Sequence, residues 1–211
     1  MMEDNPVKTR IRNKENSKQQ FLDAVGKILK TQGYSALKIN NIATTAGLDK
    51  KLIYNYFGGL EGLLDEYIKT QDFWSNVKSE IEPNEITDGG KEFITNTVLE
   101  QFDYVFRNKE FQKVLLWRLS EPRNSLKKLT DEQEANGEFI LQNIMDTYFA
   151  ENSEDSRAAM ALIVSGAYYL NLYAEINGNT FCGIDIKSET GRNQIKKAIA
   201  MLIEQVYTFL K

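Results

Sequence analysis

The chain has 211 residues and is 42 % hydrophobic, which is enough for a sizeable core in one large domain or two small ones. Its single cysteine excludes an intrachain disulfide. With one cysteine and no histidine, the chain lacks the ligands of a structural zinc site and the commonest general base of enzymes. We therefore expect no metal, no cofactor and no enzymatic activity. The net charge of −4 is unevenly divided: residues 1–60 carry ten Lys and Arg against five Asp and Glu, whereas residues 61–211 carry sixteen against twenty-five, and a basic segment on an acidic body is the pattern expected of a part that meets phosphate.

Neither a membrane span nor a secretion signal is expected. No run approaches the ~18 apolar residues that cross a bilayer, and the first twenty residues lack the apolar centre of a signal peptide. The sequence therefore indicates a cytoplasmic protein with no membrane partner.

The first sixteen residues are polar, contain Pro6 and carry basic side chains at alternate positions, Lys8, Arg10, Arg12 and Lys14. We interpret residues 1–16 as a flexible basic arm, which either settles along a nucleic-acid backbone or minor groove or remains a solvated tail; both interpretations stay open. Structure is expected to begin at Ser17, which forms a capping box with Gln20. An apolar stripe then predicts a first helix up to Gly33, through Phe21, Leu22, Val25, Ile28 and Leu29.

Residues 39–57 predict two short helices joined by a very tight turn. The first helix has one inward face, formed by Ile39, Ile42, Ala43 and Ala46. Gly47 can end it in the left-handed conformation, and Asp49 can accept hydrogen bonds from the backbone N–H groups two and three residues further on, so that the next helix starts at once. Two helices joined so closely, with apolar Leu48 between them, match the helix-turn-helix that reads DNA.

The second of these helices has a polar outward face. At about 100° per residue, Ile53 and Phe57 lie within about 40° of each other and face the core. The outward side carries the candidates for reading base edges, Lys51, Leu52 and Asn55, because lysine can donate to guanine, asparagine can pair with adenine and leucine can touch a thymine methyl. The candidates for phosphate contact flank this face, Lys50, Tyr54 and Tyr56, although for Tyr56 packing in the core is the stronger interpretation.

Four short segments stand at the spacing of a known family: Ile42-Ala43, Ala46-Gly47-Leu48, Tyr54-Asn55-Tyr56-Phe57 and Glu61-Gly62-Leu63-Leu64. Together they resemble the N-terminal domain of the tetracycline-repressor (TetR) family of bacterial transcription regulators, over about fifty residues. The resemblance implies contacts to the DNA backbone at Lys50 and Tyr54.

The sequence departs from the family pattern at three positions. Lys38 stands where the family often has a threonine or serine that caps the first of the two helices and touches phosphate, and we expect Lys38 to supply charge to phosphate instead. Leu60 replaces a frequent lysine, so one usual phosphate contact is lost. Leu52 replaces a small residue on the reading face, so it meets a thymine methyl or stays exposed.

The rest of the chain predicts an all-α protein. A helix from Leu60 is expected to run to about Ile81, before breaks at Pro83 and at Gly89-Gly90. Further helices are expected at residues 93–106, 111–119, 125–149, 156–176 and 191–210, with no strand. We therefore expect three parts: the arm 1–16, a helix-turn-helix DNA-binding domain 17–64, and a helical effector-binding and dimerisation domain 65–211.

Two C-terminal helices carry apolar stripes that we interpret as a dimer interface. One helix-turn-helix reads too few base pairs to be selective, which calls for a homodimer on a palindromic operator in double-stranded DNA. The family resemblance implies that the last two helices supply the interface. The stripes consist of Leu162, Ser165, Gly166 and Tyr169, and of Ile195, Ile199, Leu202, Val206 and Phe209. The other interpretation is that both stripes face only the intrachain core.

Aromatic side chains in the middle of the chain are candidates for an effector pocket, namely Phe102, Phe106, Trp117, Tyr148, Tyr168 and Tyr173. Aromatic residues at helical spacing more often pack a core, so none is assigned singly. Because no inward-facing charged pair is evident, we expect the small-molecule effector, whose identity is unknown, to be apolar or aromatic.

The sequence thus favours a sequence-specific DNA-binding regulator, most simply a repressor that a small molecule releases from its operator. The alternative is a helical, dimeric protein-interaction module that has lost DNA binding, for which the changes at Lys38 and Leu60 leave room. An acidic run, Asp131, Glu132, Glu134 and Glu138, suits a solvated helix face better than a catalytic carboxylate site.

Overall fold

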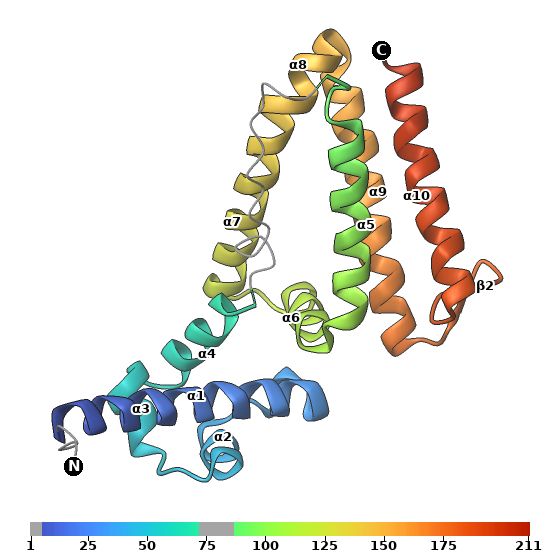
Figure 1. Ribbon diagram of the computed structural model, residues 1–211. Helices are drawn as coiled ribbons and strands as arrows, with labels where there is room; N and C mark the ends of the chain where they lie inside the picture. Colours follow the sequence, from blue (N-terminus) through green and yellow to red (C-terminus); the bar gives the residue numbers. More distant parts are fainter. Residues whose placement is uncertain (1–5, 72–86) are drawn as a thin grey trace, which may run out of the picture. The chain divides into compact units, whose positions relative to one another are not determined.

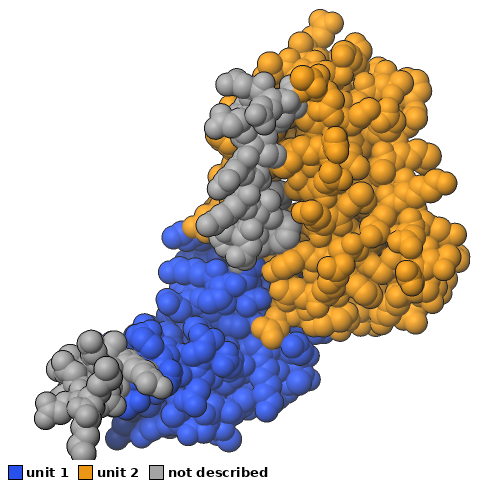
Figure 2. All heavy atoms as spheres, in the orientation of Figure 1, with its two compact units in different colours: residues 1–73, 113–130 blue, residues 74–112, 131–211 orange. Residues whose placement is uncertain are grey.

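The computed structural model describes the backbone of residues 6–71 and 87–211 and the side chains of residues 13–71 and 87–211 (Figure 1). Apart from one small hairpin, the regular structure described is helical: α1 (Pro6–Gln32), a 3-10 turn (Tyr34–Ala36), α2 (Ile39–Ala46), α3 (Lys51–Phe57), α4 (Leu60–Lys69), α5 (Lys91–Arg107), α6 (Lys109–Ser120), α7 (Asn124–Ile140), a π-helical segment (Leu141–Met145), α8 (Asp146–Phe149), a 3-10 turn (Ala150–Asn152), α9 (Ser153–Ile176) and α10 (Glu189–Phe209). The chain divides into two compact units, unit 1 with residues 1–73 and 113–130, and unit 2 with residues 74–112 and 131–211 (Figure 2).

Unit 1 is built around α1. The apolar stripe of this helix, fully buried at Phe21, Val25, Ile28 and Leu29, packs with inward side chains of α2, α3 and α4. The end of α6 and the start of α7 join the same core through Val114, Trp117, Leu126 and Leu129. Unit 1 therefore extends past residue 64 and takes in a second segment, because these later side chains complete its core.

The helix α1 begins at Pro6, so the expectation of a flexible arm is wrong for residues 6–16. Proline is tolerated in a first helical turn, and no further proline interrupts the helix before Gln32. Ser17 does not cap the helix, because it lies inside it and its hydroxyl donates to the carbonyl of Asn13 at 2.9 Å. A serine three residues before a glutamine occurs inside helices as well as at their starts, so the Ser17–Gln20 pattern did not identify the start of the helix.

The helix α4 ends at Lys69 and is shorter than expected. The hydroxyl of Thr70 donates to the carbonyl of Tyr67 at 2.6 Å, which satisfies a group at the end of the helix with a side chain. The continuation expected as far as Ile81, including Trp74, lies outside the described residues.

Unit 2 packs α5, α9 and α10 around an apolar core that includes Phe102, Met145, Phe149, Ile163 and Ile203. A charged group also lies inside it, because Arg192 is only 7 % exposed. Its guanidinium carbon lies 4.1 and 3.9 Å from the ring centroids of Phe102 and Phe106 and its nitrogens donate to Asp103 at 2.8 Å and Asn171 at 3.0 Å. The expectation that no charged pair faces inward is wrong, since partners 89 residues apart in sequence leave no local pattern.

The loop after α9 forms a short hairpin, which corrects the expectation of no strand. Strand β1 (Thr180–Phe181) pairs antiparallel with β2 (Ile184–Asp185), with Thr180 opposite Asp185 and Phe181 opposite Ile184. The two residues of the turn, Cys182 and Gly183, both have positive φ, 49° and 78°. This is the geometry of a two-residue hairpin turn, and two residues per strand are too few to give a sequence signal.

One guanidinium spans the π-helical segment. Arg157 of α9 donates to both carboxylate oxygens of Glu138 at 2.6 and 3.0 Å, and to both of Asp146 at 2.9 and 2.6 Å. These hydrogen bonds lower the pKa of both carboxyl groups, and they outweigh desolvation, which acts in the other direction. Arg157 therefore fixes the chain on both sides of Leu141–Met145.

The long helical stretch Asn124–Ile176 contains an 18-residue window that is apolar enough to cross a membrane by length and composition, with a mean hydropathy of 1.2. This corrects the expectation that no such run exists. Only 28 % of the window is buried. Among the apolar side chains of α9, Leu162 and Tyr169 are exposed, whereas Met160 and Ile163 are buried.

Candidate nucleic-acid interface

The two short helices of unit 1 are joined as the sequence predicts. Gly47 ends α2 with φ 68° and ψ 27°, and the N–H of Leu48 donates to the carbonyl of Ala43 at 3.1 Å, so the last turn is closed by backbone. The carboxylate of Asp49 accepts a hydrogen bond from the N–H of Lys51 at 2.8 Å. The N–H of Leu52, which the sequence also assigned to the Asp49 side chain, donates instead to the backbone carbonyl of Asp49 at 3.0 Å, so a left-handed glycine and an aspartate turn together lead into α3.

The helix α3 presents the predicted polar face. Ile53 is fully buried, and Phe57 is partly buried with its ring edge-on to Phe21 at 6.2 Å. Lys51 and Asn55 are exposed. Leu52 lies between these two environments, partly buried against the core, so only part of its side chain remains available to a base.

The predicted phosphate candidates differ in their surroundings. Lys50 and Lys38 are exposed, Tyr54 is 55 % exposed, and the ammonium group of Lys50 donates to the side-chain oxygen of Asn40 at 3.3 Å. Lys38 precedes α2 in an extended conformation, and its side chain makes no capping hydrogen bond. Tyr56 is half-buried against the core, in agreement with the packing interpretation.

Close approach of the backbone holds α4 against the end of α3. A Cβ at Gly62 would lie 1.9 Å from the carbonyl oxygen of Phe57, so no other residue fits there without movement. Leu60, at the start of α4, is partly buried and packs on the core. The Glu-Gly-Leu-Leu segment thus has a steric role in placing the reading helix.

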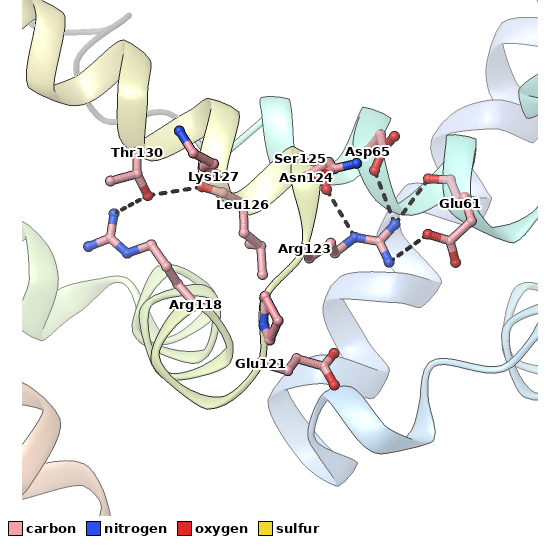
Figure 3. Close-up of a pocket in the computed structure, with 11 residues that line it drawn as sticks. Glu61, Asp65, Arg118, Glu121, Arg123, Asn124, Ser125, Leu126, Lys127 and Thr130 are labelled. Atoms are coloured by element: carbon pink, nitrogen blue, oxygen red, sulfur yellow. Dashed lines mark hydrogen bonds and ion pairs between the residues drawn. The ribbon is translucent and has the colours of Figure 1, made fainter.

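Sequence reasoning missed Arg123, which ties the turn between α6 and α7 to α4. Figure 3 shows its guanidinium pointing at Glu61 and Asp65, to which it pairs at 2.8 and 3.0 Å, beside an open hollow of about 810 Å³. The side chain of Arg123 is only 14 % exposed and also lies 5.3 Å from the ring centroid of Trp117. Partners about sixty residues apart gave no short-range signal that could have found this clamp.

The C-terminal stripes are divided between core and surface. Leu162 is 75 % exposed, Tyr169 53 % and Leu202 47 %, with Ser165 also exposed and Gly166 partly so. Ile199 is buried in the core of unit 2, and Ile195 and Val206 pack partly against that core. Met201 and Phe209 add exposed apolar surface on α10, and Phe209 was among the residues that the periodicity picked out.

Most of the aromatic pocket candidates pack within unit 2. Phe102 and Phe106 cover Arg192, Tyr148 packs on Phe149 and Tyr207, and Tyr173 packs on Tyr169 and Phe181. Tyr168 pairs with Gln101 through a hydrogen bond. Trp117 is an exception, because it stacks on Tyr34 at 6.0 Å in the core of unit 1, the unit of the helix-turn-helix. It therefore does not line a pocket in unit 2.

Two features define the class of protein. A tight helix-turn-helix exposes lysine and asparagine on its second helix, and the lysines beside it remain outside ion pairs with described carboxylates. These features belong to a DNA-binding helix-turn-helix protein.

Comparison with known families identifies the helix-turn-helix segment. Residues 17–67 match the model of "Bacterial regulatory proteins, tetR family", which confirms the resemblance predicted from the sequence for this part of the chain. This is a family of regulators and not of enzymes. A comparison with curated proteins gave no match.

Solved structures share the fold along almost the whole chain. A TetR transcriptional regulator from Agrobacterium tumefaciens is 18 % identical, with a TM-score of 0.52 over 89 % of this chain and 93 % of that one. NalD of Pseudomonas aeruginosa, "the secondary repressor of MexAB-OprM multidrug efflux pump", is 14 % identical, with a TM-score of 0.54 over 93 % and 96 %. HlyIIR, "a Hemolysin II transcriptional Regulator", is 14 % identical, with a TM-score of 0.51 over 91 % and 97 %. The all-α fold class is therefore confirmed.

Proposed function

We propose that the protein is a cytoplasmic repressor that binds a palindromic operator as a homodimer and leaves it when a small molecule binds unit 2. The observation that carries the proposal is the outward face of α3, where Lys51 and Asn55 are exposed beside Lys50 and Tyr54 on a domain of the tetR family. Lysine and asparagine are donors suited to base edges in the major groove. NalD, whose fold is similar, is described as a repressor.

The exposed apolar side chains of α9 and α10 support a homodimer. Leu162 and Tyr169 on α9, and Met201, Leu202 and Phe209 on α10, are each about half exposed or more. Large exposed apolar residues gathered on two long helices favour an interface with another chain. A two-fold dimer would present two copies of α3 to the two halves of a palindromic operator.

The interior of unit 2 supports a more polar effector than the sequence suggested. Gln112 is fully buried, its amide donates to the carbonyl of Val105 at 2.7 Å, and its Oε1 accepts no hydrogen bond from the residues described. A buried acceptor of this kind is normally satisfied. An effector that reached this oxygen would need a hydrogen-bond donor as well as aromatic or apolar groups.

Footprinting on the DNA upstream of the protein's own gene tests DNA binding and operator symmetry together. We expect protection of two half-sites about one helical turn apart, and affinity that falls steeply as salt rises because bound phosphates release counterions. A reporter driven by the same promoter is expected to rise when the gene is deleted. Loss of reporter signal on deletion would contradict repression, and binding that is absent or independent of salt would contradict DNA recognition.

A further inference from the structure

Two lysines of α1 lie over the aromatic pair at the end of α3. The ammonium nitrogen of Lys14 is 5.6 Å from the ring centroid of Tyr56, and that of Lys18 is 5.7 Å from the ring centroid of Phe57. Because the two lysines are four residues apart, they share one side of α1. Tyr56 and Phe57 themselves pack edge to face at 6.5 Å. The two ammonium groups therefore each lie over one ring of the Tyr56–Phe57 pair.

The described acidic side chains do not compensate these two cations. Among the described residues, neither ammonium group pairs with a carboxylate. In unit 2, by contrast, three lysines form ion pairs. The distances from the ammonium nitrogen to the nearest carboxylate oxygen are 2.8 Å for Lys91 and Glu204, 2.8 Å for Lys109 and Glu175, and 3.0 Å for Lys196 and Asp103. The positive charge of Lys14 and Lys18 therefore remains available to a partner.

Contact with a ring orients an ammonium group without consuming its donors. A cation–π contact at an exposed site is weak, and the lysine keeps three N–H donors that can turn to an anion. The position of Lys14 adjoins the flank of the reading face, because Tyr56 directly follows Asn55 on α3, and Lys18 lies about one turn further along α1 over the neighbouring ring of Phe57. If α3 enters the major groove as proposed, the backbone of the duplex passes that flank. Leu60, the next side chain of the segment after the glycines, has no donor.

We propose that Lys14 and Lys18 form a phosphate clamp, in which α1 grips the DNA backbone beside α3 and the rings of Tyr56 and Phe57 hold the two ammonium groups in position. The clamp rests on the proposed DNA recognition and adds to it a contact made from outside the helix-turn-helix. Its partner is the phosphodiester backbone of double-stranded DNA.

The test is the salt dependence of binding to a fluorescent 30-base-pair duplex of random sequence, measured by anisotropy with the full chain. Each phosphate neutralised contributes about 0.9 to the slope of log affinity against log salt. We expect the double variant Lys14→Gln, Lys18→Gln to lose about 1.8 of that slope, with the largest loss of affinity at low salt. The charge-conserving variant Lys14→Arg, Lys18→Arg is expected to keep the wild-type slope.

Lys27 provides the matched control. It is exposed on the same helix, and nine residues from Lys18 it stands about half a turn away on the helical wheel. Lys27→Gln removes one charge and is expected to change the slope by much less than 0.9. If Lys27→Gln lowers the slope as much as Lys14→Gln, the effect is one of net charge and the clamp is wrong.

Two outcomes distinguish failure of the phosphate clamp from failure of the proposed DNA recognition. Wild-type protein that binds with a steep slope, beside a double variant that melts normally and has the same slope, overturns the clamp and leaves DNA recognition intact. Wild-type protein with no salt-dependent binding to this duplex overturns the proposed DNA recognition as well. Should the double variant melt early, the single variants are measured, each with an expected loss of about 0.9 in slope.

Discussion

At the scale of single residues, we propose that α3 divides base reading from backbone contact. Lys51 and Asn55 stand on the exposed face, whereas Lys50 stands at its edge and is tethered to Asn40. We expect Lys51→Ala and Asn55→Ala each to cost ~1–3 kcal/mol of binding to the operator and to relax its sequence preference. Lys50→Ala is expected to weaken binding to every duplex alike.

Anisotropy titrations with operator and with random duplex check this division. The ratio of the two affinities is expected to fall for Lys51→Ala and Asn55→Ala and to stay constant for Lys50→Ala. Equal losses on both duplexes for all three variants would show that α3 contacts only the backbone.

Two glycines in helices predict opposite effects of the same substitution. A Cβ at Gly62 would lie 1.9 Å from the carbonyl oxygen of Phe57, whereas one at Gly137 of α7 meets nothing within 4 Å. We expect Gly62→Ala to lower the free energy of unfolding by about 2–4 kcal/mol through overpacking. Gly137→Ala is expected to raise it by about 0.5–1 kcal/mol, since alanine favours a helix over glycine.

Urea unfolding followed by circular dichroism measures both glycine variants. Because they lie in different units, the transition of each unit is fitted separately. A Gly62→Ala protein as stable as the wild type would mean that the α3–α4 junction can move apart without cost.

At the scale of elements, α5 and α10 are joined by a charged cluster whose strength depends on pH. Burial of the Asp103 carboxyl opposes its ionisation, but hydrogen bonds from Arg192 and Lys196 prevail and lower its pKa below 3.8. The folded carboxyl thus binds its proton less readily than the unfolded one. Its contribution to stability is complete above the ordinary pKa and is lost as the pH falls through the lower pKa of the folded state.

We expect Asp103→Asn to destabilise unit 2 at pH 7, because Arg192 is then buried without a counter-charge. The difference from wild type should shrink as the pH falls below about 3.8. Urea unfolding at a series of pH values measures it. Glu100→Gln, exposed on the same helix, is the control and should track the wild type. A difference for Asp103→Asn that does not vary with pH would show that the carboxylate charge is not what stabilises the cluster.

The elements that sequence could predict are those set by local signals. Gly47 and Asp49 define the turn within three residues, and Ile53 is placed by helical periodicity alone. The sequence placed the start of α1 at Ser17 and not at Pro6, because no single residue between Pro6 and Ser17 marks that stretch as helical. The Arg192–Asp103 pair and the Arg123 clamp were missed because their partners are distant in sequence.

At the scale of the whole molecule, the exposed faces of α9 and α10 predict the oligomeric state. In a two-fold dimer each substitution occurs twice, once on each chain, so a carboxylate in the interface is desolvated in both copies. We expect Leu162→Glu with Leu202→Glu to yield monomers, as measured by light scattering after size exclusion. Phe139→Glu replaces a side chain that is 65 % exposed on α7 and is expected to leave the dimer intact.

Wild-type protein that is monomeric at micromolar concentration would contradict the dimer. A dimer that survives the Leu162 and Leu202 changes but dissociates on Phe139→Glu would instead locate the interface on α7. Operator affinity measured on the same samples should fall with dimer content, because in the proposed dimer each chain reads one half-site.

The two compact units do not coincide with the domain boundary predicted from the sequence. A boundary after residue 64 follows the family pattern, yet the core of unit 1 is completed by Trp117, Leu126 and Leu129 from a later segment. Contiguity in sequence is a poor guide when a helix such as α7 contributes to two units. The isolated residues 17–64 therefore lack part of their own core.

The π-helical segment Leu141–Met145 contains one residue more than a regular α-helix needs over the same turn. In a regular α-helix, residues eight apart such as Glu138 and Asp146 differ by about 80° in direction, and residues seven apart by about 20°. A π turn accommodates one extra residue, so eight residues here cover the angle of seven and both carboxylates reach Arg157. Loss of one residue within Leu141–Met145 would turn the segment into plain α-helix and keep the same pairing. We therefore expect a single-residue deletion within this segment to be tolerated better than one in the regular part of α7.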